Sequence, residues 1–281
     1  MYPNDLFNIF GLGIDLYTIC FLVGVILCLI FTIIGMKKSG YSSSASDTMI
    51  IIGIFAIIIG LIFGVLFQSL YDFIENPSAG FKITGRMTFI GGLIGGVISY
   101  LGIYFLYVYA INPKLKKGNF FKSNMNKGLW DLLKFAPISI TIAHGFGRIG
   151  CSFAGCCYGR ETTAWYGIWN EFLGYKTVPI QLFEATFLFV LSVIMIVLFF
   201  KFNFKYNMSV YLISYGIWRF IIEFFRADDR GGTIIGLEPS QFWSIFMVIG
   251  GIAFFFIYRY FDKKFIEKQT LVNEENEKNA Q

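Results

Sequence analysis

The stretch VPIQLFEATFLFVLSVIMIVLFF, from Val178 to Phe200, decides what kind of fold this chain can adopt. A helix needs about 20 mainly apolar residues to cross the hydrocarbon core of a bilayer, and this stretch is long enough to do so. An apolar run of this length is typical of a membrane span. The stretch therefore predicts a membrane-spanning helix.

The rest of the chain repeats this pattern. Of its 281 residues, 56% are hydrophobic, 20% are aromatic and only 15% are charged, which excludes an ordinary soluble domain. The apolar segments are Tyr17–Met36, Thr48–Ser69, Thr88–Ala110, Leu129–Ile149, Val178–Phe200, Met208–Phe225 and Gln241–Phe261. We therefore expect an all-α integral membrane protein with seven transmembrane helices.

The lysines and arginines between these segments indicate an orientation. Fourteen of them follow the first, third or fifth segment or end or follow the seventh, and six follow the second, fourth or sixth. Because cytoplasmic loops carry the excess of positive charge, the N-terminus is expected outside and the C-terminus in the cytoplasm. Residues 1–266 would form the membrane domain, and residues 267–281 a disordered cytoplasmic tail. No segment is typical of nucleic-acid binding, so no nucleic-acid partner is expected.

The run AHGFGRIGCSFAGCCYGR, from Ala143 to Arg160, holds the candidate chemistry. It contains the only histidine, His144, and places Arg148 one helical turn later. Ionisable groups at membrane depth are expensive to bury and mark a candidate site. Arg148 could extend to the outer interface or hold a phosphate with its planar guanidinium. His144 could be a hydrogen-bonded structural residue or a proton acceptor near neutral pH.

A second group of charges lies on the sixth segment. Arg219 and Glu223 are four residues apart and share a helix face, and Arg226 follows about two turns below Arg219. The pair could simply neutralise itself and tie helices together. Alternatively, the three residues form a charged stripe that enters an outward-facing cavity.

The five cysteines divide by position. Cys20 and Cys28 lie in the first segment and are expected to pack as small apolar residues. Cys151, Cys156 and Cys157 follow the fourth segment, where packing around a lipid site, an external disulfide and a zinc site are all open. Their spacing matches no common zinc pattern, so packing is expected and no metal is predicted.

Several blocks, taken in order, resemble the bacterial prolipoprotein diacylglyceryl transferase family. The resemblance runs from Gly13 to about Tyr258. The blocks are Tyr17 in the first helix, FIGGLIG at Phe89–Gly95, GRIG at Gly147–Gly150 with Gly159 closing it, TAWYG at Thr163–Gly167, PIQLFEA at Pro179–Ala185 and YGIWRFIIEFFR at Tyr215–Arg226. Each block alone is weak, and their shared order carries the resemblance.

The resemblance implies an enzyme of the bacterial cytoplasmic membrane that uses membrane lipid as substrate. It would transfer a diacylglyceryl group from phosphatidylglycerol to the lipobox cysteine of prolipoprotein signal peptides, with no cofactor. The expected catalytic residues are His144, Arg148, Arg219 and Glu223. The expected substrate-binding residues are Tyr17, Gly150, Cys151, Gly159 and Arg226.

Three positions depart from the family pattern. Ile90, Cys151 and Cys156 stand where the family usually has histidine, asparagine and glutamate. We expect His144 to replace the missing histidine as proton acceptor. Two other functions stay open: a related transferase with the same lipid donor and a different acceptor, and a non-catalytic lipid-binding or transport protein.

Overall fold

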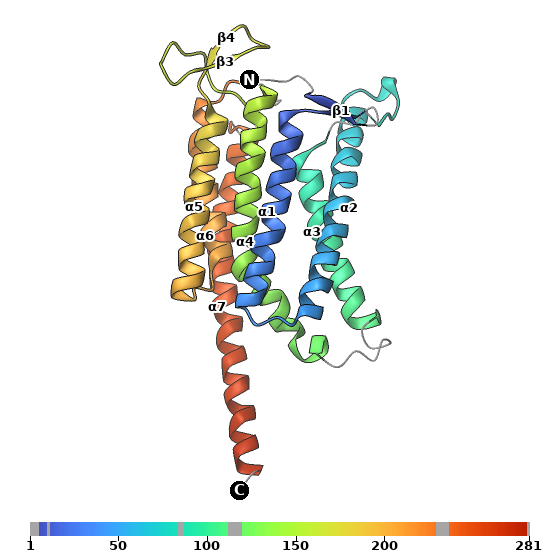
Figure 1. Cartoon of the computed structure of the whole chain (residues 1–281), viewed down its shortest axis with the longest axis vertical. Coiled ribbons are helices and arrows are strands. Elements are labelled where there is room, and N and C mark those ends of the chain that lie inside the picture. The colour runs from blue at the N-terminus through green and yellow to red at the C-terminus, as the bar shows by residue number, and fades with distance from the viewer. Residues whose placement is uncertain (1–5, 10–11, 84–86, 112–119, 229–235, 280–281) are drawn as a thin grey trace. The chain divides into compact units, whose positions relative to one another are not determined.

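The computed structural model describes residues 6–9, 12–83, 87–111, 120–228 and 236–279. The chain divides into two compact units, Met1–Gly35 with Leu132–Gln281, and Met36–Asp131. The described residues contain seven α-helices (Figure 1), which confirms the predicted all-α class. The helices are α1 (Leu16–Lys38), α2 (Ser43–Glu75), α3 (Phe89–Leu106), α4 (Phe120–Ala154), α5 (Ile180–Phe202), α6 (Asn207–Ile222) and α7 (Pro239–Asn279).

The remaining elements are short. Two antiparallel hairpins pair β1 (Phe7–Ile9) with β2 (Leu12–Ile14), and β3 (Ile168–Asn170) with β4 (Tyr175–Thr177). Single turns of other helix types are η1 (Pro77–Ala79), η2 (Tyr107–Ile111) and η3 (Glu223–Phe225). The helices therefore carry the fold, and the β3–β4 hairpin belongs to the connection between α4 and α5.

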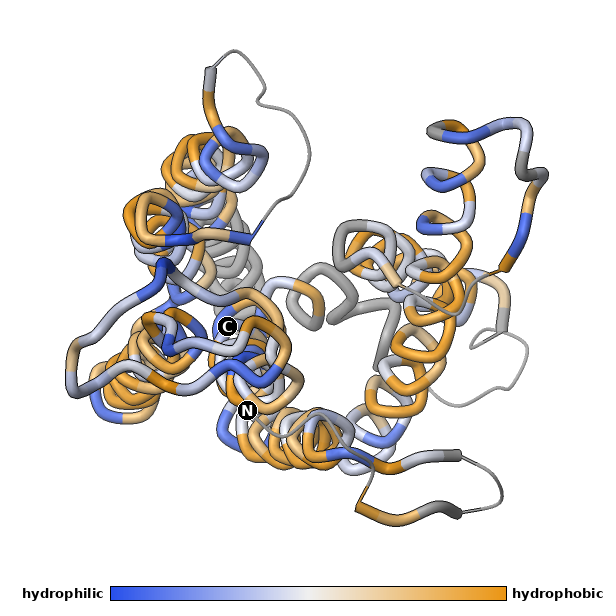
Figure 2. Tube along the Cα trace, turned by 90° about the horizontal axis from the view of Figure 1, so that it is seen from above, coloured by the Kyte–Doolittle hydropathy of each residue, from blue (hydrophilic) through white to orange (hydrophobic). Residues whose placement is uncertain are grey.

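Six helices in the described part of the chain are long and apolar enough to cross a membrane, where the sequence predicted seven. They are α1, α2, α3, α5, α6 and α7, and Figure 2 shows the orange of apolar residues along the helices. The predicted fourth segment lies in α4, whose apolar run is interrupted by Pro137, His144 and Arg148. A crossing by α4 stays a prediction.

Small residues let α2 and α3 approach closely within the second unit. A Cβ added to Gly60 would lie 2.9 Å from the carbonyl oxygen of Gly92, and one added to Gly64 would lie 3.2 Å from that of Thr88. Helices in lipid associate through such close backbone packing, because no hydrophobic effect drives them together there. Ile90, which replaces the expected histidine, lies in the first turn of α3 in this unit.

Glycines also allow close packing between the helices of the first unit. A Cβ on Gly24 of α1 would lie 3.1 Å from the carbonyl oxygen of Ala143 in α4. A Cβ on Gly216 of α6 would lie 3.0 Å from the carbonyl oxygen of Ser244 in α7. These contacts hold α4 and α6, which carry most of the predicted site residues, against their neighbours.

The end of α4 is fixed by the loop that follows it. Gly155 has φ 74°, a left-handed conformation that suits glycine and ends the helix after Ala154. Its carbonyl accepts a hydrogen bond of 3.3 Å from the Asn170 amide in β3. Gly159 then forms an isolated β-bridge with Arg226, just after η3. The loop after α4 is thereby tied to the end of α6.

The polar end of the chain was predicted to be a disordered tail from residue 267. In the structure α7 continues as a helix through Asn279. The division between a membrane domain ending at residue 266 and a separate tail stays a prediction.

Candidate active site

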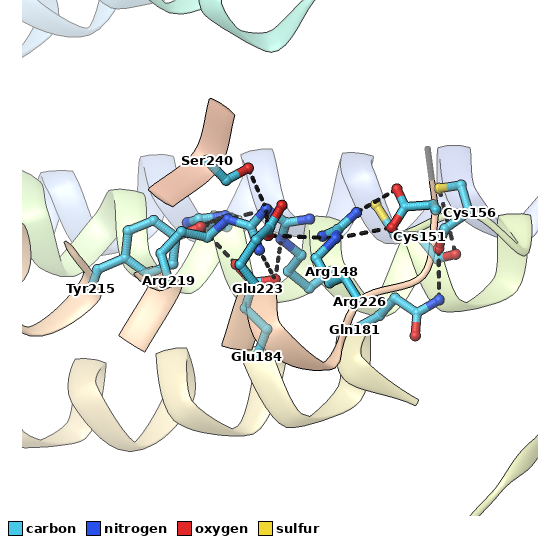
Figure 3. A network of polar contacts seen from close by, with 12 residues as sticks. Arg148, Cys151, Cys156, Gln181, Glu184, Tyr215, Arg219, Glu223, Arg226 and Ser240 are labelled. Atoms are coloured by element: carbon cyan, nitrogen blue, oxygen red, sulfur yellow. Dashed lines mark hydrogen bonds and ion pairs between the residues drawn. The ribbon is translucent and has the colours of Figure 1, made fainter. Parts of the chain in front are cut away.

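Two arginines from different helices contact one buried carboxylate, Glu184 of α5 (Figure 3). Arg148 Nε lies 3.1 Å from Glu184 Oε2, and Arg219 Nη1 lies 3.9 Å from the same oxygen. The Tyr215 hydroxyl donates a hydrogen bond of 2.7 Å to Glu184 Oε1. Glu184 is 0% exposed. These contacts join α4, α5 and α6 through a single charged side chain.

A second carboxylate, Glu223, extends the network past the end of α6. Its Oε2 lies 2.8 Å from Arg219 Nη2 and 3.6 Å from Arg226 Nε. Arg226 also donates to both carboxylate oxygens of Asp228, at 3.0 and 2.6 Å. Arg219 Nη2 donates a further hydrogen bond of 2.8 Å to Ser240 Oγ. Arg219 and Glu223 thus form the predicted pair, and they do so within a larger network.

The network keeps donors that an additional anion could use. Arg219 Nη1 is buried and makes no hydrogen bond to any residue that the structure describes. The Arg148 side chain is 16% exposed although it pairs with Glu184. A guanidinium has five N–H donors, so it can hold a carboxylate and a phosphate oxygen together. The arrangement therefore suits binding of a phosphate group beside fixed carboxylates.

His144 lies between two tyrosines of α6. Its Nδ1 is 3.5 Å from the Tyr211 hydroxyl, and its Nε2 is 3.4 Å from the Tyr215 hydroxyl. The imidazole also packs edge-on against the Tyr215 ring, with centroids 4.8 Å apart. Since Tyr215 donates to Glu184, the histidine is joined to the network through a tyrosine hydroxyl.

The predicted binding glycines serve as close contacts in the structure. A Cβ on Gly150 would lie 3.0 Å from Tyr17 Cδ2, so this glycine lets α4 pass the Tyr17 ring in α1. A Cβ on Gly159 would lie 2.8 Å from the carbonyl oxygen of Val178, to which the Gly159 N–H donates at 3.0 Å. Contact of Tyr17, Gly150 or Gly159 with substrate stays a prediction.

Asp15 lies immediately before α1, the helix that carries Tyr17. Its Oδ1 accepts hydrogen bonds from the Thr18 N–H at 2.8 Å and from the Thr18 hydroxyl at 2.6 Å. These bonds satisfy a donor at the start of α1, and the Thr18 hydroxyl lowers the pKa of Asp15. The cap therefore supports the fold above the unfolded-state pKa of the carboxyl, and this support is lost as the pH falls through its lowered value.

Three cysteines gather at the end of α4. All the Sγ atoms of Cys151, Cys156 and Cys157 lie within 4.8 Å of one another, and none forms a disulfide. The amide of Gln181 donates a hydrogen bond of 2.6 Å to the Cys156 carbonyl (Figure 3). The neighbouring thiols of Cys151 and Cys156, and then the guanidinium of Arg226, lower the pKa of the Cys157 thiol.

The structure brings His144, Arg148, Arg219 and Glu223 into one connected network, but two of its central members were missed. Glu184 links the two arginines and Tyr215 links His144 to Glu184. Glu184 had a signal in the sequence, because it is the only charged residue between Val178 and Phe200. Tyr215 opens the block Tyr215–Arg226 that resembles the family, but its residue type alone gave no signal, since the chain contains 16 tyrosines.

These features define a multi-helix membrane protein with a buried network of arginines and carboxylates beside its only histidine. The chain belongs to the prolipoprotein diacylglyceryl transferase family, whose sequence profile matches residues 4–257.

Relatives match over nearly their whole length. The chain is 33% identical over 264 residues to the phosphatidylglycerol–prolipoprotein diacylglyceryl transferase of Clostridium tetani, covering 91% of this chain and 97% of the relative. It is 32% identical to a second enzyme of that name, from Clostridium perfringens, covering 86% and 91%. It is 29% identical to the Pasteurella multocida enzyme, covering 92% and 93%. The predicted family is confirmed.

Proposed function

We propose that this chain transfers a diacylglyceryl group from phosphatidylglycerol to the cysteine thiol of a prolipoprotein signal peptide. The observation that carries this proposal is the buried network in which Arg148 and Arg219 share Glu184, with donors left for a phosphate. Family membership supports the same reaction.

The reaction requires the protein to stabilise the leaving phosphate group and to accept the proton of the thiol. The cysteine sulfur forms a bond to the terminal glyceryl carbon of the lipid, and the bond between that carbon and the phosphate oxygen breaks. The electron pair of the broken bond goes to the phosphate oxygen, and glycerol phosphate leaves as an anion. The thiol proton must go to a base, because the thiolate is the nucleophile.

The arginines are suited to stabilising the leaving phosphate group. A phosphodiester that lies against the exposed part of Arg148 and the unused donor of Arg219 would have its growing negative charge stabilised in a site with little water. Glu184 and Glu223 hold the two guanidiniums in place before the lipid enters. This preorganised arrangement is what lowers a barrier, because the charges need not reorient during the reaction.

His144 is suited to accepting the proton of the acceptor thiol. The contacts of its Nε2 with Tyr215, and of Tyr215 with Glu184, provide a path for a proton through the network. His144 would accept or relay the proton of the acceptor thiol, in place of the histidine that Ile90 replaces. Neutral imidazole is the usual general base near neutral pH.

We predict that His144→Gln slows transfer by about 10²-fold or more, which is the scale of losing a general base. The measurement is a transfer assay: the purified protein in detergent micelles, phosphatidylglycerol and a lipobox peptide, with the thioether product followed by mass spectrometry. The loss should shrink as the pH rises, because the thiol then ionises without help. Tyr211→Phe is the matched control, since it removes a contact with His144 and keeps the imidazole. An unchanged rate and pH profile in His144→Gln would remove the histidine from the reaction.

We also propose that α4 crosses the membrane as a seventh span, with the N-terminus outside and the C-terminus in the cytoplasm of a bacterial cell. The charge asymmetry of fourteen against six basic residues supports this orientation. Arg86, Lys114, Lys116, Lys117 and Arg230, which contribute to it, lie outside the described residues.

The orientation predicts the behaviour of reporter fusions in the cytoplasmic membrane. A reporter that works only in the cytoplasm should be active when fused after Lys117, between α3 and α4 in the sequence, and inactive when fused after Gly174, in the loop between α4 and α5. Equal activity at both junctions would contradict a seventh crossing. The reverse pattern would contradict the orientation.

Ile90, Cys151 and Cys156 stand where the family usually has other residues. These replacements favour a second candidate function, transfer from the same donor to a different acceptor. Expression in a bacterial strain depleted of its own diacylglyceryl transferase separates the two. Rescue of growth with lipid-modified lipoproteins supports the proposed acceptor. Consumption of phosphatidylglycerol without modified lipoproteins would favour the second function and overturn the first.

A further inference from the structure

The thiol cluster, formed by Cys151, Cys156 and Cys157, lies at the end of α4 and supplies neither the phosphate donors nor the proton acceptor proposed for the transfer reaction. Its three Sγ atoms come from one short segment and lie within 4.8 Å of one another. Cys156 is exposed, whereas the other two are partly buried. Packing alone explains this poorly, because one member faces solvent.

The backbone is shaped to bring the three sulfurs together. Helix α4 ends at Ala154 and Gly155 turns the chain with φ 74°. Cys157 adopts φ 60°, a left-handed conformation that costs a non-glycine residue about 1–3 kcal/mol and needs support from its surroundings. The Cys156 N–H donates to the Cys151 carbonyl at 3.3 Å, and Gln181 holds the Cys156 carbonyl at 2.6 Å.

The spacing fits a metal ion that prefers sulfur. Zinc–sulfur bonds are about 2.3 Å long, so thiolates on one tetrahedral ion lie about 3.8 Å apart. Sulfurs already within 4.8 Å of one another reach that separation by movements of less than about 1 Å. A disulfide would use only two of the three thiols and leave the third without a role.

We propose that the thiol cluster binds one Zn²⁺ ion through three thiolates, with the fourth coordination position open to water. Each thiol releases its proton to solvent when the ion binds. The exposed position of Cys156 gives the ion a path of entry. Three thiolates and one divalent ion leave a net negative charge, and the positive charge of the Arg226 guanidinium, which acts on the Cys157 thiol, offsets part of it.

The sequence predicts no metal site here, because the spacing of the three cysteines matches no common zinc pattern and favours packing. The arrangement of the sulfurs in space gives the opposite indication. Zinc binding by the thiol cluster does not require the transfer reaction, so either activity can be absent without the other.

The test measures bound metal on the full-length protein, purified in detergent micelles, reduced and kept free of oxygen. After incubation with Zn²⁺ and dialysis, we expect about one zinc per chain by elemental mass spectrometry. Co²⁺ in place of zinc should give the near-ultraviolet band of thiolate-to-cobalt charge transfer. Neither readout depends on enzyme activity.

Serine variants of the cysteines show whether the thiol cluster itself binds the zinc. Replacing all three cysteines by serine should abolish zinc uptake and the cobalt band, whereas Cys28→Ser, which removes a thiol of α1 elsewhere in the same chain, should keep both. Cys156→Ser alone should weaken zinc binding by more than the roughly 10–100-fold cost of losing an outer-shell partner. This single change at an exposed side chain keeps the test usable if the triple variant fails to fold.

Two results would overturn the proposal. One is a reduced wild-type protein that takes up no zinc and shows no cobalt band. The other is zinc uptake that persists unchanged in the folded Cys156→Ser and triple-serine variants, because the ion would then be bound elsewhere.

Discussion

Arg148→Ala is expected to reduce the rate of diacylglyceryl transfer by about 10²–10³-fold, the scale of removing one charged or hydrogen-bonding group that stabilises a developing anion. Arg148 contacts the buried Glu184 at 3.1 Å and still exposes 16% of its side chain, so it can reach both the network and the lipid phosphate. The transfer assay measures this loss as an initial rate. The protein should remain in the membrane and keep its helices.

Two further variants show whether the loss of transfer rate is specific to the guanidinium of Arg148. Arg148→Lys should also be slow, since an ammonium group cannot reproduce the planar fork that holds two oxygens at once. Arg160→Ala, which removes an exposed arginine of the following loop, should keep nearly the wild-type rate. A rate close to wild type in Arg148→Ala would exclude this residue from phosphate binding.

Glu184→Gln is expected to have the largest effect on stability. The substitution keeps the volume of the side chain and an acceptor for the Tyr215 hydroxyl, but it removes the charge that faces Arg148 and Arg219. Breaking a buried ion pair by removing one partner costs about 3–5 kcal/mol, because the remaining charge is left uncompensated. Thermal unfolding of the purified protein should show a clear fall in the midpoint.

Glu161→Gln is the matched control for this change, because Glu161 is exposed on the loop after α4. The double variant Arg148→Ala with Glu184→Gln should cost less stability than the two single losses added together, since the residues share one contact. Additive losses would mean that the two residues do not act as a pair.

The sequence predicted the helices well because apolar length is a local property. The stretch Val178–Phe200 corresponds to α5 at Ile180–Phe202, and the predicted segment Met208–Phe225 corresponds to α6 with η3. The fourth segment is the exception. Its site residues make α4 polar, so the features that give it chemistry weaken its signal as a membrane span.

The sequence predicted His144, Arg148, Arg219 and Glu223 as site residues, but it did not predict the roles of Glu184 and Tyr215 that connect them. Arg219 and Glu223 share a helix face, so their pairing followed from spacing. The link from Arg148 to Arg219 through Glu184 depends on how three helices pack, which no local pattern contains. The thiol cluster likewise depends on left-handed backbone at Gly155 and Cys157, and cysteine spacing alone did not indicate it.

The most direct measurement is the transfer assay on the wild-type protein. The account predicts that a lipobox peptide gains the mass of one diacylglyceryl group, that glycerol phosphate is released in equal amount, and that a peptide with serine in place of the cysteine gains nothing. A well-folded protein that binds phosphatidylglycerol but never modifies the cysteine peptide would contradict the account.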